Sequence, residues 1–214
     1  MSALELYFSP GACSFVPHVG LEAAKAAFEP KLVKLHRGEQ RTAEYLAMNP
    51  NGQVPVLVVD GRPLTQIVAI CDYIDREFPS AALLPRGTRD RSQALSQLAW
   101  MNSTPHTTAT RFFFPERYAE TESARLEVKE RAAQEFRGYL ERIHEGVPAS
   151  GYWLGDRVSF HDAYAFTLLR WGGFAGIDPR TLPRYLAYAE RVLQAPPVAA
   201  AAARERIRLD TYKG

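Results

Sequence analysis

From residue 3 to about residue 78, short apolar runs alternate with helical patterns. The runs ALELYF, FEPKLVKL and VPVLVVDGRPL predict strands, and apolar residues at helical spacing predict helices from Val16 to Ala27, around Tyr45 to Met48, and from about Gln66 onward. The third run contains Asp60-Gly61, a turn dipeptide that predicts a hairpin. This order of elements predicts a mixed sheet with helices packed on it.

The helix that begins near Gln66 carries one apolar stripe, which predicts that it packs against the sheet. The stripe consists of Ile67, Ile70, Cys71, Ile74 and Phe78. Because Cys71 lies on this stripe, we predict that it is an inert core residue. Two prolines and a glycine between Pro79 and Gly87 then interrupt the periodicity, and no strand pattern follows them. We therefore predict an α/β domain over residues 1–80 and an all-helical domain over residues 88–214.

Within the second half, helical stripes predict a bundle. One of them consists of Leu126, Ala133, Phe136, Leu140 and Ile143. The stretch from Phe160 to Trp171 is apolar on almost every side, which predicts a helix buried at the centre of the bundle. Ser159 and Asp162 form an S-x-x-D capping box at its start, able to pair with the first free backbone amides.

The charge balance argues against a nucleic-acid-binding surface, because 26 basic and 24 acidic residues leave a net charge of +2 with no long run of one sign. Cys13 and Cys71 have no CxxC spacing and no His/Cys cluster, so we expect neither a disulfide framework nor a metal site. No basic leader is present, and no stretch approaches the roughly 20 apolar residues that cross a bilayer. We expect a cytoplasmic protein with small-molecule partners and no membrane contact.

The first candidate for chemistry is Cys13, in the sequence SPGACS between a predicted strand and a predicted helix. At a helix N-terminus, free amides and the helix dipole favour a thiolate over a thiol, so this position predicts a nucleophile. A small buried hydrophobe is the structural alternative. The glycine and proline ahead of Cys13 favour the nucleophile, because a turn of this kind lets a substrate approach.

Two further segments suit a peptide ligand. In NPNGQVPV, a cis Val54-Pro55 bond would direct the Val54 backbone toward an extended peptide, whereas an ordinary turn with a trans proline is the alternative. In LTQIVAI, Gln66 and the amides that follow it can hold a carboxylate, whereas a solvated polar residue at a helix start is the alternative.

The segments LYFSPGACSFVPH, MNPNGQVPVL, LTQIVAICDYI and SFHDAYAF together resemble the glutathione transferase family, and specifically its bacterial beta class. The resemblance covers essentially the whole chain. It implies a thioredoxin-like domain joined to a helical bundle, assembly as a homodimer, and glutathione as co-substrate.

The resemblance also implies roles for single residues. It places Cys13, Ser14 and His106 at the reacting thiol, and it assigns glutathione binding to Tyr7, Cys13, Val54, Pro55, Gln66 and Ile67. Three positions depart from the family's pattern. Ile67 has no hydroxyl where a small residue such as serine is common, Thr107 stands where lysine is frequent, and Phe8 replaces a tyrosine.

The predicted activity is conjugation of glutathione to small hydrophobic electrophiles held by the helical domain. The substrate-side candidates are Thr110, Arg111, Phe112, Phe113 and Trp171, for which core packing is the alternative. Two other functions stay open. The first is thiol-disulfide exchange through a mixed disulfide of Cys13 with glutathione, and the second is a non-catalytic binding module with the same fold.

Overall fold

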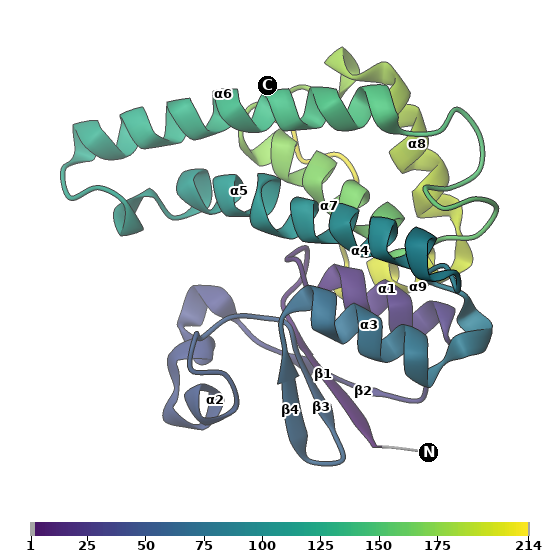
Figure 1. The fold of residues 1–214 in the computed structure, drawn as a ribbon. Helices are drawn as coiled ribbons and strands as arrows, with labels where there is room; N and C mark the ends of the chain where they lie inside the picture. The colour runs from purple at the N-terminus through teal and green to yellow at the C-terminus, as the bar shows by residue number, and fades with distance from the viewer. Residues whose placement is uncertain (1–2, 214) are drawn as a thin grey trace.

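The computed structural model describes residues 3–213; residues 1, 2 and 214, which the predicted domains include, lie outside that range. The first half contains a sheet of four strands in the order β2-β1-β3-β4 (Figure 1). β1 pairs with β2 in parallel, while the pairs β1/β3 and β3/β4 are antiparallel. The elements in chain order are β1 (Leu4–Phe8), α1 (Phe15–Ala23), β2 (Glu29–Leu32), α2 (Ala43–Met48), β3 (Val56–Val59), β4 (Arg62–Thr65) and α3 (Ile67–Glu77).

The alternation along β1 divides its side chains between two cores. Leu4, Leu6 and Phe8 are buried in the main core with residues of α1 and α3. Tyr7 packs instead against a smaller core that contains Tyr45 of α2 and Val56 of β3. The sheet is therefore covered by helices on both faces, as the order of elements predicts.

Most local predictions for this half are confirmed. The hairpin turns at Asp60 and Gly61, which have φ angles of 47° and 77°. The predicted helix from Val16 to Ala27 is shorter than expected, because α1 ends at Ala23 and Lys25 adopts a left-handed φ of 50°. The predicted stripe of α3 is confirmed, since Ile67, Ile70, Cys71 and Ile74 are all buried.

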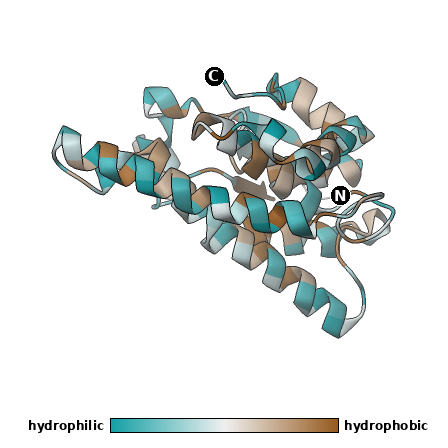
Figure 2. Cartoon of the chain, turned by 90° about the horizontal axis from the view of Figure 1, so that it is seen from above, coloured by the Kyte–Doolittle hydropathy of each residue, from teal (hydrophilic) through white to brown (hydrophobic). Residues whose placement is uncertain are grey.

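The second half of the described chain contains helices and no strand of the sheet. Its helices are α4 (Thr88–Ser103), α5 (Pro105–Phe113), α6 (Glu122–Gly146), α7 (Phe160–Phe174), α8 (Pro183–Gln194) and α9 (Pro196–Glu205). The prediction of a buried central helix is confirmed, because every residue of α7 from Phe160 to Gly173 is buried. The predicted stripe of α6 is wrong at Leu126, which is 54% exposed. The first turns of α6 extend away from α7 in Figure 1, and hydrophilic residues predominate on its outward side in Figure 2.

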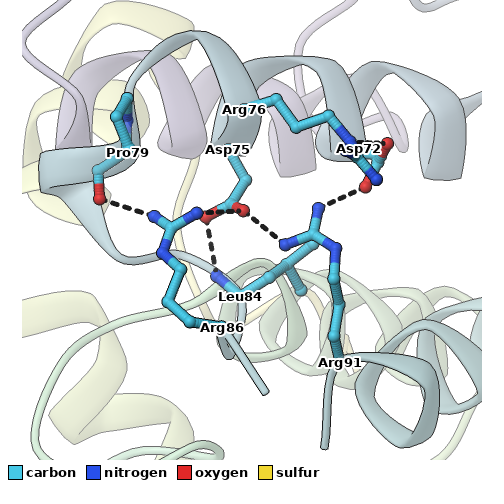
Figure 3. A network of polar contacts seen from close by, with 7 residues as sticks. All are labelled: Asp72, Asp75, Arg76, Pro79, Leu84, Arg86 and Arg91. Atoms are coloured by element: carbon cyan, nitrogen blue, oxygen red, sulfur yellow. Dashed lines mark hydrogen bonds and ion pairs between the residues drawn. The ribbon is translucent and has the colours of Figure 1, made fainter. Parts of the chain in front are cut away.

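The two halves share one hydrophobic core, because α1 packs against both α7 and α9. A polar network reinforces the junction between α3 and α4 (Figure 3). The fully buried carboxylate of Asp75 accepts hydrogen bonds from the Leu84 amide at 3.0 Å, from Arg86 at 3.1 Å and from Arg91 at 2.6 Å. Since a buried carboxylate is stable only when it is paired, this network fixes the chain between the sheet and the helical half.

Candidate active site

The sheet register brings three predicted features to one end of the sheet. Tyr7 lies opposite Val56, and Val56 lies opposite Thr65, in two antiparallel pairs. The next residues along each strand are Phe8, Pro55 and Gln66, so they are neighbours at that end. The Cys13 turn follows Phe8 directly, and the Cys13 thiol donates a hydrogen bond to the Val54 carbonyl at 3.3 Å. The predicted nucleophile and the two predicted peptide-binding segments therefore form one site.

The turn before Cys13 is closed by a local hydrogen-bond pair. The Ser14 hydroxyl donates to the Ser9 carbonyl at 3.2 Å and accepts from the Ser9 amide at 3.1 Å. Ser14 is fully buried. Its hydroxyl is thus used to shape the turn, and its predicted place at the reacting thiol stays a prediction.

Cys13 is a buried thiol rather than a thiolate. Its side chain is 7% exposed, and burial raises its pKa from 9.0 to about 12, although the backbone amides of Cys13 and Ser14 act to lower it. The prediction that the helix N-terminus ionises Cys13 is therefore wrong, because desolvation of the charged form outweighs the amides. Cys71 is completely buried with its pKa raised well above its ordinary value by burial, which confirms the prediction of an inert core residue.

The predicted cis bond between Val54 and Pro55 is confirmed. The carbonyl before it is braced, because Asn49 and the Tyr45 hydroxyl both donate to the Gln53 carbonyl, at 2.7 and 2.8 Å. No acceptor within residues 3–213 pairs with the Val54 amide. An unpaired amide on a buried residue is rare in native proteins, so the Val54 backbone has a free donor at the site.

Gln66 adopts an unusual backbone conformation directly before α3, with a φ of 72° and a ψ of 120°. A residue with a side chain holds such a φ only where the surroundings impose it, and such residues cluster at ligand sites. The amides at the start of α3 have no acceptor inside the helix. The Ile67 side chain is buried in the core, so only its amide is available for the role that the sequence suggests.

Tyr7 lies in the smaller core, and its predicted glutathione binding stays a prediction. Its hydroxyl donates to Glu5 at 3.3 Å, and its ring packs edge-on against Tyr45. Burial and the negative charge of Glu5 raise its pKa. Since side chains alternate along a strand, Tyr7 faces α2 while Phe8 faces the main core.

The helical half clamps the Cys13 turn at Gly11, which has a left-handed φ of 71°. The Gly11 amide donates to Glu205 of α9 at 2.8 Å, and its carbonyl accepts from the indole of Trp171 at 3.0 Å and from Arg170 at 3.5 Å. His18 is fully buried behind the turn, with its Nδ1 2.7 Å from Glu205. Sequence reasoning missed Arg170 and Glu205; a lone arginine inside an apolar helix was the available signal.

Comparison with known proteins identifies the family. Residues 2–76 match the family described as "Glutathione S-transferase, N-terminal domain". The chain is 32% identical to glutathione S-transferase GST-4.5 of Xanthomonas campestris pv. campestris, over 89% of this chain and 93% of that protein. The chain belongs to the glutathione S-transferase family. The predicted thioredoxin-like domain followed by a helical domain is thereby confirmed, and the protein is a transferase enzyme.

Solved structures agree with this membership. The bacterial beta class glutathione S-transferase of Sphingomonas chungbukensis is 34% identical, with a TM-score of 0.82 over 94% of this chain and 98% of that one. A glutathione transferase homologue from Sulfitobacter, solved with bound glutathione, is 26% identical, with a TM-score of 0.89 over 97% of this chain and 100% of that one. The predicted similarity to the beta class is therefore confirmed.

In this glutathione S-transferase, His106 of α5 is held in one orientation by Tyr164 of α7. The two side chains are 2.6 Å apart at Nδ1, and the Tyr164 hydroxyl donates its single proton to Asn102 at 3.1 Å. The Tyr164 oxygen must therefore accept from His106 Nδ1–H, which leaves Nε2 as a proton acceptor. Burial lowers the His106 pKa from 6.5 to about 4, so the ring is neutral at neutral pH.

The substrate-side candidates of the transferase divide into two groups. Phe113 packs against Trp171 at 5.6 Å between ring centroids, and Trp171 packs against His106 at 4.9 Å, so these three aromatic rings are continuous beside the Gly11 clamp. Phe174, which sequence reasoning missed, extends this group with a ring that is 55% exposed and 6.0 Å from Phe113. A run of rings at i, i+3 on α7 was the signal for it.

The other candidates lie at the edge of this group or outside it. Phe112 is buried against Phe136 of α6, and its ring also lies 4.7 Å from that of Phe113, so it backs the aromatic group from the core side. Arg111 forms an ion pair with Glu135 of α6 at 3.0 Å and so is held toward α6. The Thr110 hydroxyl bonds to Tyr118 at 2.6 Å and to the Thr107 carbonyl at 2.7 Å.

Among the described residues, no three His, Cys, Asp or Glu side chains are arranged to hold a metal ion. Within the same range, none of the helices combines the length and apolar character that a membrane span requires.

Proposed function

We propose that this enzyme binds glutathione at the site formed by the Cys13 turn, Val54 and Gln66, and transfers it to small hydrophobic electrophiles. The observation that carries the proposal is the Val54 amide, which has no acceptor within residues 3–213, beside a Val54 carbonyl whose one partner in that range is the Cys13 thiol. An extended peptide laid along Val54 would pair with this amide in the manner of an added strand. The glutathione-bound Sulfitobacter homologue supports the ligand.

The α3 N-terminus suits the γ-glutamyl end of glutathione. Gln66 lies beside Pro55 in the register, so it adjoins a peptide paired with Val54. Free amides at a helix start attract a carboxylate, and the Gln66 side chain both donates and accepts. The φ of 72° at Gln66 supports a binding role for this corner, because strained backbone positions of this kind cluster at ligand sites.

His106 is the group we assign to the thiol proton. Its Nε2 carries a lone pair, while Nδ1–H is held by Tyr164. In the proposed step the glutathione thiol donates a hydrogen bond to Nε2, its proton passes to solvent as the sulfur attacks the electrophile, and the leaving group departs with its bonding electrons. The product is a thioether, and His106, whose pKa of about 4 keeps it neutral, orients the thiol without retaining its proton.

The electrophile would lie against the aromatic group of His106, Phe113, Trp171 and Phe174. The exposed ring of Phe174 marks its open side. Flat apolar compounds fit such a surface, because offset and edge-to-face ring contacts add to the burial of apolar area.

Disulfide exchange by Cys13 is the weaker candidate. That reaction needs a thiolate, whereas burial raises the Cys13 pKa to about 12. Cys13 as a protonated donor near the glutathione sulfur agrees better with transfer than with nucleophilic attack.

The test is turnover of glutathione with a chlorodinitrobenzene-type aryl halide and, in parallel, with a mixed glutathione disulfide. We expect aryl transfer by the wild type, at least partial retention in Cys13→Ala, and a loss of about 10- to 100-fold in His106→Ala, the effect of losing one hydrogen bond to the reacting thiol. Cys71→Ala is the matched control and should behave as wild type. Disulfide turnover that Cys13→Ala abolishes, without aryl transfer in the wild type, would replace this proposal with the redox function.

A further inference from the structure

The last seven described residues, 207–213, have no regular secondary structure and run back along α7; we call them the strap. The strap begins where α9 ends, because Arg206 adopts a left-handed φ of 55° and the Ile207 amide bonds back to the Ala202 carbonyl at 3.0 Å. Ile207 and Leu209 are half-buried against the main core. The strap is therefore a packed part of the fold.

Two contacts fix the strap against α7. The Thr211 hydroxyl donates to the Arg170 carbonyl at 2.5 Å. At Gly173 the strap comes so close that a side chain would not fit, since a Cβ there would lie 2.2 Å from the Thr211 hydroxyl and 2.8 Å from the Tyr212 amide. Gly173 is thus required for the close approach of the two backbones.

Arg170 connects the strap to the Cys13 turn. Its guanidinium is buried, and it donates to the Arg208 carbonyl of the strap through Nε and to the Gly11 carbonyl of the turn at 3.5 Å. No carboxylate within residues 3–213 forms an ion pair with it. A buried cation must have its donors satisfied, so loss of the Arg208 carbonyl would remove a main reason for the guanidinium to stay in place.

The Cys13 turn also leaves space for Arg170. A Cβ at Gly11 would lie 2.8 Å from one guanidinium nitrogen, and Gly11 also holds a left-handed φ of 71°. Cys13 follows two residues later in the same turn and is 7% exposed. We propose that the strap positions the Cys13 turn through Arg170, which acts as a positioning residue and touches no reacting atom. This inference rests on the proposed function only in treating that turn as part of the glutathione site.

Gly173→Ala tests the proposal, because the added methyl group displaces the strap without reaching Gly11. We expect the rate of Cys13 alkylation by iodoacetamide to rise roughly fivefold, the effect of losing about one hydrogen bond that holds the turn. The Michaelis constant for glutathione should rise by a similar factor, with a smaller change in kcat. Cys71 alkylation, measured by mass spectrometry in the same sample, reports any general loosening of the core.

Gly138→Ala is the matched control, because Gly138 also lies in a helix and an added Cβ there meets nothing within 4 Å. It should change neither quantity. A chain that ends at Arg206 should show the same changes as Gly173→Ala. In that shortened chain Gly173→Ala should add nothing, because its clash partners are gone.

The outcomes separate the strap from the proposed function. If the shortened chain and Gly173→Ala both leave Cys13 alkylation and the Michaelis constant at wild-type values, the strap does not position the turn. An effect of Gly173→Ala that persists in the shortened chain also overturns the proposal. If the wild type fails to use glutathione, the proposed function fails, and the alkylation comparison alone still decides the role of the strap.

Discussion

Each end of α7 carries a buried polar cluster, and the two clusters contact different halves of the chain. At the start of the helix, Asp162 accepts four hydrogen bonds, from the Ser159 amide and hydroxyl, the Trp153 amide and the Tyr188 hydroxyl. All of these partners belong to the helical half. At the other end, Arg170 and Trp171 donate to Gly11 in the first half of the chain. One cluster therefore stabilises the helical half, whereas the other connects the same helix to the Cys13 turn.

Asp162→Ala should have the largest effect on stability without an effect on the site. Removing the Asp162 carboxylate leaves three buried donors and one part-buried donor without their partner, and we expect a loss of roughly 3–5 kcal/mol in the free energy of unfolding. Urea unfolding measures it. The Michaelis constant for glutathione of the molecules that remain folded should not change, because none of the four donors contacts the Cys13 turn.

Asp156→Ala is the control for this change. Asp156 lies in the loop that precedes α7, is exposed, and has no hydrogen-bond or ionic partner within residues 3–213, so its removal should cost less than about 0.5 kcal/mol. An Asp162→Ala variant that unfolds like wild type, or that binds glutathione more weakly, would contradict the division of labour between the two ends.

Histidines beside both ends give a pH prediction. Burial lowers the pKa values of His161 and His106 from 6.5 to about 4. As pH falls below 6.5, the unfolded chain takes up a proton before the folded one, so stability is full above that pH and is lost between pH 6.5 and about 4. Each histidine contributes up to about 3 kcal/mol to this loss.

The pH dependence of unfolding for His161→Gln and His106→Gln distinguishes the two ends. Glutamine at position 161 retains a donor for the Ala94 carbonyl, which His161 Nε2 contacts at 2.8 Å. Each variant should lose part of the slope between pH 6.5 and 4, and only His106→Gln should reduce glutathione turnover. If the free energy of unfolding depends on pH in both variants as it does in the wild type, burial does not lower the pKa of either histidine.

The structural features that depend on residues close together in the sequence could be predicted from it. The hairpin at Asp60-Gly61, the stripe of α3, the box at Ser159 and Asp162 and the buried α7 were predicted from local patterns, and all are present. Local chemistry decides these features, because turn conformation, helical spacing and capping act over four residues or fewer.

The site could be predicted only in part, for the same reason. The ionisation of Cys13 was misjudged, because burial by distant elements outweighs the nearby amides. The clamp at Gly11 was missed, since Arg170 and Glu205 lie 159 and 194 residues away along the chain. Phe112 and Phe113 are adjacent, and only the position of α6 decides that Phe112 enters the core.

The smallest effect is expected from replacing a tryptophan by phenylalanine at each end of α7. Trp171→Phe removes the indole donor to the Gly11 carbonyl and retains a ring against His106 and Phe113. We expect a loss of about 1 kcal/mol in stability and a roughly fivefold higher Michaelis constant for glutathione, because one hydrogen bond to the turn is lost. The effect stays modest since Arg170 still donates to the same carbonyl.

Trp153→Phe is the matched variant at the start of α7. It removes an indole donor to Gln97 at 3.0 Å and retains a ring stacked on His161. Its stability should fall by the same amount, about 1 kcal/mol, with the Michaelis constant unchanged. Steady-state kinetics and urea unfolding of both variants give the answer. If Trp171→Phe and Trp153→Phe change the Michaelis constant equally, a lost hydrogen bond at either end of α7 affects the site. The two ends of α7 would then not differ in function.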